Sequence, residues 1–199
     1  FSRYVPYPSA LLNDASAAGL AEFWIRGEPG NAFYISLSNN VGGAVMINNQ
    51  ILGGAHFHSG EIGHLTLRPG GKTCYCGQKG CADPYLAATV LSAPCGGNLE
   101  EFFRQLEGGS KNARKIWDAY LDNLALAVNN LQALFDCKII MGGYVAEYLE
   151  KYMDEVKKRA AKLNTFEKDA DYLEISRYKT NSIAAGAALY FISRFIDSI

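Results

Sequence analysis

The sequence predicts a layered α/β domain, because short strands gather near the N-terminus and helices then alternate with single strands. β-rich runs at residues 32–38, 43–47 and 50–54 are separated by Asn-Asn and Gly-Gly pairs, a pattern typical of an antiparallel meander. Hydrophobic residues make up 49% of the 199 residues, which is enough for one substantial core. No internal repeat or low-complexity linker interrupts the chain, so we expect a single domain over residues 1–199.

The N-terminal elements are predicted from the residues at their boundaries. A helix is expected from about residue 15 to 25, since Asn13 and Asp14 precede an alanine-rich run that ends at Gly27. In the meander, the pair Asn48-Asn49 predicts a tight turn between the second and third strands. A polar loop that is rich in glycine and cysteine follows the third strand.

The second half of the chain is predicted to be mainly helical. A short buried strand breaks at Gly142 and Gly143 directly into a helix, a layout in which backbone amides can meet an anion or a nucleotide. These glycines are therefore candidate nucleotide-binding residues, and the simpler alternative is that they form only a strand-to-helix turn. The expected helices cover residues 83–93, 99–107, 112–135, 145–163 and 182–196, and the expected strands cover residues 137–143 and 172–176.

Charge and hydropathy exclude several classes of protein. The chain has 19 Lys and Arg against 20 Asp and Glu, so nothing in it is built to bind nucleic acid or an anionic membrane. The longest apolar window, residues 183–192, is too short to span a bilayer, and we expect it to be a buried C-terminal helix. No secretory signal is visible, and the missing initiator Met suggests a fragment. The tight spacing of Cys74, Cys76 and Cys81 fits a metal in a reducing cytoplasm better than disulfides.

The cysteine-rich loop has the ligand types and spacing of a zinc site. His64, Cys74, Cys76 and Cys81 offer one nitrogen and three sulfurs, a set that suits tetrahedral zinc. Disulfides fit poorly, because a Cys-x-Cys bridge is strained and one thiol would remain. A full protein ligand set predicts a structural zinc without an open position for water. The alternative is a flexible loop with free thiols, and Cys95 and Cys137 are expected to be ordinary core or near-surface residues.

The motifs "GEIGH" (60–64) and "CYCGQKGCAD" (74–83) resemble the signature of the ROK family, which groups bacterial sugar kinases with sugar-responsive transcriptional repressors. The flanking motifs "NDASAAGLAE", "IIMGG" and "NSIAAGAAL" resemble the same family, so the likeness covers nearly the whole chain. It implies an α/β fold of the actin-like or ribonuclease H-like ATPase type with an inserted zinc loop. It also implies that this chain is the C-terminal portion of such a protein.

The resemblance further implies a sugar site beside the zinc. Asp14 matches the family's base for a sugar hydroxyl, and Asn13 would bind a neighbouring hydroxyl. Glu61 and His64 would contact the sugar, with His64 using its other ring nitrogen for zinc. The resemblance implies a sugar contact for Asp83 as well, which stands where the family usually has Glu and has a side chain one methylene shorter. The simpler alternatives are helix capping by Asn13 and Asp14, a solvated surface acid at Glu61 and a helix-start residue at Asp83.

The phosphate-binding elements depart from the kinase pattern. The family's Asp-x-Gly-x-Thr loop is absent, and Ser38, Asn39 and Asn40 stand where kinases have Gly-Thr-Gly. Added side chains there would hinder a close approach of backbone to phosphate. We therefore favour the sugar-sensing part of a ROK-type regulator, which would bind DNA through a segment upstream of Phe1. The alternative is the C-terminal half of an ATP- and Mg-dependent hexose or amino-sugar kinase with Asp14 as general base. Either would be a homodimer or homotetramer by family resemblance.

Overall fold

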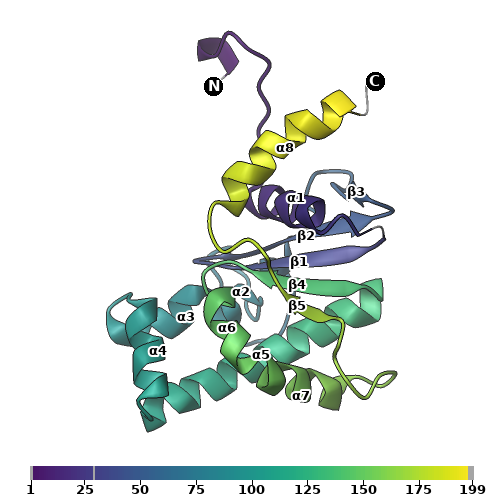
Figure 1. The fold of residues 1–199 in the computed structure, drawn as a ribbon. Coiled ribbons are helices and arrows are strands. Elements are labelled where there is room, and N and C mark those ends of the chain that lie inside the picture. Colours follow the sequence, from purple (N-terminus) through teal and green to yellow (C-terminus); the bar gives the residue numbers. More distant parts are fainter. Residues whose placement is uncertain (1, 29, 197–199) are drawn as a thin grey trace.

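The computed structural model describes residues 2–28 and 30–196. A five-stranded mixed sheet in the order β3-β2-β1-β4-β5 lies between two layers of helices (Figure 1). Helix α1 covers one face and carries α8 on its outer side, and the larger helical layer built around α5 covers the other face. The strands are β1 Ala32–Leu37, β2 Val41–Ile47, β3 Gln50–Ile51, β4 Lys138–Gly142 and β5 Leu173–Ile175.

The predicted meander is present. β1 pairs antiparallel with β2, and β2 pairs antiparallel with β3. Asn48 and Asn49 form the connecting turn with φ angles of 50° and 66°, the left-handed conformation that a two-residue hairpin turn requires. β3 is shorter than expected and ends at Ile51, before Gly53 and Gly54. β4 and β5 extend the other side of β1 in parallel, which gives the α/β layering that the sequence predicts.

Small residues bring α1 (Asp14–Arg26) close to the sheet. A Cβ atom added at Gly19 would lie 2.6 Å from the Cβ of Ala44, and one at Gly42 would lie 2.8 Å from the Cβ of Ala15. The helix therefore rests almost directly on β2, and its N-terminus is fixed over the end of the sheet that carries the β1–β2 turn. The small core on this face consists of Ala18, Phe23, Ala32, Tyr34, Ala44, Met46 and Ile140.

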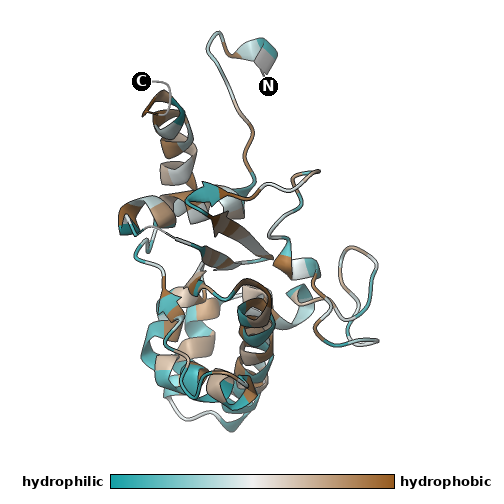
Figure 2. Cartoon of the chain, turned by 90° about the vertical axis from the view of Figure 1, so that its right-hand side faces the viewer, coloured by the Kyte–Doolittle hydropathy of each residue, from teal (hydrophilic) through white to brown (hydrophobic). Residues whose placement is uncertain are grey.

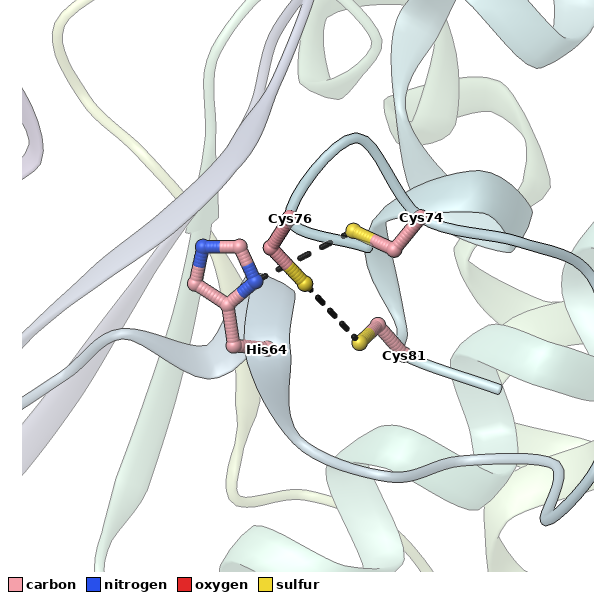
Figure 3. A group of neighbouring side chains, drawn as sticks. All are labelled: His64, Cys74, Cys76 and Cys81. Atoms are coloured by element: carbon pink, nitrogen blue, oxygen red, sulfur yellow. Dashed lines mark hydrogen bonds between the residues drawn. The ribbon is translucent and has the colours of Figure 1, made fainter. Parts of the chain in front are cut away.

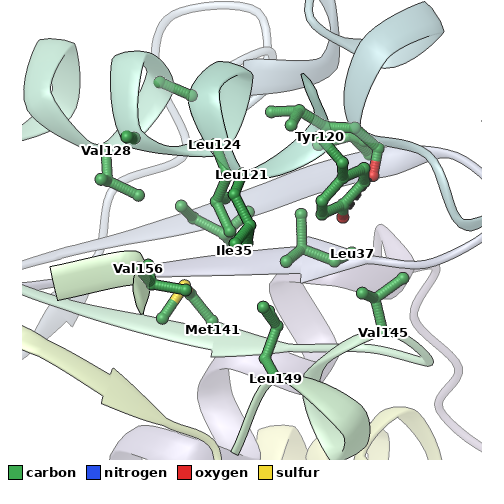
Figure 4. Packing of buried hydrophobic residues seen from close by; sticks show 14 of the residues in the cluster. Ile35, Leu37, Tyr120, Leu121, Leu124, Val128, Met141, Val145, Leu149 and Val156 are labelled. Atoms are coloured by element: carbon green, nitrogen blue, oxygen red, sulfur yellow. Dashed lines mark hydrogen bonds between the residues drawn. The ribbon is translucent and has the colours of Figure 1, made fainter. Parts of the chain in front are cut away.

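The opposite face of the sheet carries the main core (Figure 4). Alternate residues of β1, including Ile35 and Leu37, point to this face, as the period of two in a strand requires. They meet Leu121 and Leu124 of the long helix α5, all fully buried. The helices here are α2 Asp83–Leu86, α3 Ala88–Ser92, α4 Leu99–Glu107, α5 Lys111–Phe135, α6 Ala146–Leu149 and α7 Met153–Leu163. The described chain also has short 3-10 turns at Ser2–Tyr4, Ile62–His64, Ala93–Cys95 and Glu150–Tyr152.

Two helices that the sequence predicts as continuous are divided. Residues 83–93 break at Ala87, whose ψ of 145° is extended, and the next amide, that of Ala88, donates to the Ser38 carbonyl at 2.7 Å. Residues 145–163 divide into α6 and α7 with a 3-10 turn between them. A hydrogen bond to another element therefore ends the helix that begins at Asp83. The local pattern of apolar residues cannot predict such a bond.

The expectation of a buried C-terminal helix is wrong. Helix α8 (Ser182–Ile196) packs on α1 along one side, and Gly186 is its only buried residue. Ile183, Phe191 and Ile192 are about half exposed, and Figure 2 shows the apolar colouring along this helix. Its sequence is apolar on every side, but only one side has a neighbour in the described structure. No helix within residues 2–28 and 30–196 combines the length and apolar character that a membrane crossing needs.

Candidate functional site

The first turn of α1 presents the Asn13-Asp14 pair. Asn13 is the N-cap, and its Oδ1 accepts a hydrogen bond from the Ser16 amide at 3.0 Å. Asp14 is exposed, and its Oδ1 accepts from the Ala15 amide at 2.7 Å. Within residues 2–28 and 30–196, no hydrogen bond to Asp14 Oδ2 is found. Asn13 therefore fills the capping role, whereas Asp14 keeps one carboxylate oxygen for a ligand.

Two glycines place Glu61 against the sheet. A Cβ at Gly60 would lie 2.5 Å from the Gly43 carbonyl oxygen, and one at Gly63 would lie 2.2 Å from the Val41 carbonyl oxygen. The turn that carries Glu61 thus lies flat on the backbone of β2, which only glycine at these two positions allows. Glu61 itself is exposed.

The candidate sugar residues from α1 and from the "GEIGH" turn meet at one place. Asn13 Nδ2 donates to Glu61 Oε1 at 3.4 Å, although 48 residues separate the two in the chain. His64 ends the same short 3-10 turn that Glu61 precedes. The structure therefore brings Asn13, Asp14, Glu61 and His64 to one exposed surface, where amide, carboxylate and imidazole groups can exchange hydrogen bonds with hydroxyls.

Asp83 is placed differently from these four residues. Its carboxylate is buried, with 6% of the residue exposed, and Oδ1 accepts from the Val41 amide at 2.8 Å. Its role as a helix-start residue is also visible, since it begins α2. Asp83 thus fastens α2 to the start of β2, and the sugar contact that the resemblance implies stays a prediction.

The four candidate zinc ligands form one cluster (Figure 3). Their donor atoms all lie within 4.8 Å of one another; Cys76 Sγ is 3.8 Å from Cys81 Sγ, and His64 Nδ1 is 3.9 Å from Cys74 Sγ. Two sulfurs that each lie about 2.3 Å from a tetrahedral zinc are about 3.8 Å apart. The cluster therefore has the size and donor set of a closed zinc site.

The backbone of the cysteine loop holds this cluster in shape. The Cys74 amide donates to the Gln78 carbonyl at 2.8 Å, and Thr73 pairs with Lys79 across the loop. A hydrogen bond from the Gln78 backbone amide lowers the pKa of Cys76 to about 7, so this exposed thiol is half ionised near neutral pH. Burial raises the pKa of Cys81 to about 11. A metal would thus displace the proton of at least one thiol when it binds.

The candidate nucleotide residues Gly142 and Gly143 lie beside the Ser38–Asn40 loop. A Cβ at Gly143 would lie 2.6 Å from Ser38 Oγ, and its φ of 85° favours glycine. A Cβ at Gly142 would lie 2.1 Å from Tyr34 Oη. Close packing alone thus accounts for both glycines. Asn39 and Asn40 are exposed and are not among the residues with positive φ, so the replacement of glycine leaves this turn without backbone strain.

Two residues of interest were missed in the sequence. Tyr75 Oη lies 3.0 Å from His64 Nε2, the imidazole nitrogen that faces away from the cysteines. Glu22 is fully buried and binds Arg26 and the segment after β5. Tyr75 could have been noticed because it lies between two predicted zinc ligands in the sequence. Glu22 could have been noticed because it is the single acid within an apolar stretch of α1.

Comparisons with known proteins identify the family. The sequence model of the ROK family matches residues 1–194. This chain belongs to the ROK family. An N-acetylmannosamine kinase of Escherichia coli strain SMS-3-5 is 27% identical over 190 residues, which are 92% of this chain and 64% of that protein. The crystal structure of a ROK hexokinase from Thermus thermophilus superposes with a TM-score of 0.84 at 27% identity, over 97% of this chain and 69% of that one.

A regulator is also among the similar structures. A ROK family transcriptional regulator, described as a homologue of the E. coli MLC protein, superposes with a TM-score of 0.72 at 22% identity, over 89% of this chain and 50% of that one. At this identity the likeness concerns the fold alone. The expected actin-like α/β fold of ROK sugar kinases is thus confirmed. The preference for a regulator is not confirmed, and the kinase alternative fits these relatives better. The expected oligomer and the cytoplasmic location stay predictions.

Proposed function

We propose that this chain forms the sugar-binding part of an ATP-dependent kinase that acts on a hexose or an amino sugar. The observation that carries the proposal is the contact of Asn13 with Glu61, which joins the start of α1 to the "GEIGH" turn and leaves Asp14 exposed beside it. A hydroxyl-rich ligand needs such a group of donors and acceptors. The likeness to an N-acetylmannosamine kinase and to a hexokinase supports the same class of reaction.

In this proposal Asp14 is the general base. Its Oδ2 takes the proton of the sugar hydroxyl, while the helix amide bound to Oδ1 holds the carboxylate in place. Asn13, Glu61 and His64 orient the sugar through its other hydroxyls. ATP with Mg²⁺ supplies the phosphoryl group when bound, and the Ser38–Asn40 loop with Gly143 is the neighbouring place for its phosphates.

Zinc has a structural role in this proposal. His64, Cys74, Cys76 and Cys81 fill a tetrahedral ligand set, so a metal there has no open position for a reactant. Its task is to hold the imidazole of His64, whose Nδ1 faces the cysteines and whose Nε2 faces outward. The cysteine loop thus fixes one of the sugar-binding side chains.

The test is sugar-dependent ADP release by the full-length protein, assayed over a set of hexoses and N-acetylated amino sugars. Asp14→Asn should lower kcat by about 10² to 10⁴, the usual contribution of a general base, while sugar binding persists. Asp171→Asn, an exposed acid in the loop before β5, is the control and should leave kcat unchanged. ADP release that is equal in wild type and Asp14→Asn contradicts the assignment of the base.

The second candidate is the sugar-sensing part of a transcriptional regulator. It is favoured by Ser38, Asn39 and Asn40 in place of the kinase Gly-Thr-Gly loop. The same experiment separates the two functions, because a regulator binds sugar without releasing ADP. Its DNA contacts would come from a segment outside the sequence described.

A further inference from the structure

The two ring nitrogens of His64 face different surroundings. Nδ1 is 3.9 Å from Cys74 Sγ, inside the cysteine cluster, and Nε2 is 3.0 Å from Tyr75 Oη, outside it. When Nδ1 binds a metal through its lone pair, the ring hydrogen is on Nε2. Nε2 then donates to the oxygen of Tyr75.

The hydroxyl of Tyr75 therefore occupies the one outward hydrogen-bond donor of His64. A sugar hydroxyl offers the same acceptor chemistry as a phenol, so the two compete for the same hydrogen. The rings of His64 and Tyr75 meet edge to face with centroids 5.2 Å apart, which keeps the hydroxyl on this nitrogen.

Little else holds Tyr75 in this position. The residue is 68% exposed, and its hydroxyl makes no other hydrogen bond within residues 2–28 and 30–196. Its neighbours in sequence, Cys74 and Cys76, are fixed as members of the cluster, so only the side chain needs to rotate. Movement of Tyr75 away from His64 therefore costs little more than the hydrogen bond and one ring contact.

We propose that Tyr75 is an affinity-setting residue of the sugar site: its hydroxyl occupies His64 Nε2 in the free protein, and a sugar hydroxyl must displace it. This proposal rests on the proposed sugar site. A sugar that places a hydroxyl on His64 Nε2 must break the hydrogen bond from His64 to Tyr75, which costs part of its binding free energy. A sugar without a hydroxyl at that place leaves the hydrogen bond intact. Tyr75 thus lowers the affinity for sugars with this hydroxyl and reduces their advantage over sugars that lack it.

The first test is calorimetric titration of the zinc-loaded full-length protein with glucose and with N-acetylmannosamine. Tyr75→Phe keeps the ring but removes the competing oxygen, and it should bind the preferred sugar about 2- to 10-fold more tightly, the equivalent of one net hydrogen bond. Tyr7→Phe is the matched control, because Tyr7 is 75% exposed, and it should bind like wild type. Damage to the structure lowers affinity, so a gain is specific to displacement.

Equal or weaker sugar binding by Tyr75→Phe overturns the proposal, and weaker binding shows instead that the phenol touches the sugar. The second test needs no sugar. In protein labelled with ¹⁵N-histidine, the His64 Nε2–H signal should shift or broaden in Tyr75→Phe, since the hydrogen is then exposed to water. An unchanged signal overturns the Tyr75 proposal alone, and absence of sugar binding in every variant overturns the sugar site together with it.

Discussion

The buried carboxylate of Glu22 gives the sharpest prediction about stability. Glu22 on α1 accepts hydrogen bonds from Arg26 Nε at 2.6 Å, from Ser176 Oγ at 2.7 Å and from the amides of Arg177 and Tyr178 at 3.0 and 3.2 Å. The side chain of Glu22 is 0% exposed and that of Arg26 is 5% exposed. Glu22 thus fastens α1 to the segment that leaves β5 and leads to α8.

Glu22→Gln keeps the shape of the side chain and removes its charge. Loss of one partner of a buried ion pair costs about 3 to 5 kcal/mol, because the other charge is left uncompensated. Arg26 retains Glu174 as a second partner, so we expect a loss near the lower limit, about 3 kcal/mol. With a urea dependence of about 2 kcal/mol per molar, the midpoint of unfolding should fall by about 1.5 M.

The assay is urea unfolding at pH 7, followed by circular dichroism. Glu101→Gln is the control: Glu101 accepts from Arg104 Nε at 2.8 Å on the surface, where the Arg104 side chain is 78% exposed. An exposed pair contributes at most about 1 kcal/mol, so this variant should change the midpoint little. A Glu22→Gln midpoint within error of the Glu101→Gln midpoint refutes the reasoning.

Three further predictions concern the metal, the turn at β2 and alkaline pH. Metal analysis should find about one zinc per chain, and Cys76→Ala should release it and lower Tm; a folded wild-type protein without metal contradicts this. Gly63→Ala places a Cβ 2.2 Å from the Val41 carbonyl oxygen and should cost about 2 kcal/mol or more, whereas the control Gly53→Ala meets only the movable Phe57 ring at 3.3 Å; equal losses would contradict the account of the turn. Burial raises the pKa of Tyr34 from 10.0 to about 12, so the stability that its neutral phenol contributes is complete below pH 10 and is lost between pH 10 and 12. Over that range the free energy of unfolding should fall by about 3 kcal/mol less in Tyr34→Phe than in wild type, and an equal fall in both proteins refutes the reasoning.

Much of the fold could be predicted because local patterns determine it. Asn48-Asn49 adopts the turn that its sequence predicts, and the β2–β3 hairpin follows from it. The candidate zinc ligands could be brought together from their spacing alone, because short loops with glycine force neighbouring thiols together. The Asn13-Asp14 pair could be located in the same way, at the start of a helix.

The remaining features depend on contacts between distant residues. The carboxylate of Asp83 turns inward to the Val41 amide, and nothing in the sequence around Asp83 indicates that partner. The break at Ala87 depends on the Ser38 carbonyl, which lies in another element. The exposure of α8 could not be predicted either, since the apolar sequence of a helix does not show which of its sides pack against other elements.

The contact between α8 and α1 has a consequence for mutational tolerance. A Cβ at Gly186 would lie 1.7 Å from the carbonyl oxygen of Ala17, so every other amino acid at this position collides with the backbone of α1. Exposed positions of the same helix, such as Phe191 and Ile192, have no such restriction. A complete substitution scan of α8 should therefore show one position that accepts no replacement within a helix whose surface accepts many. Gly186, which has no side chain, is thus the residue at which α8 makes its closest contact with α1.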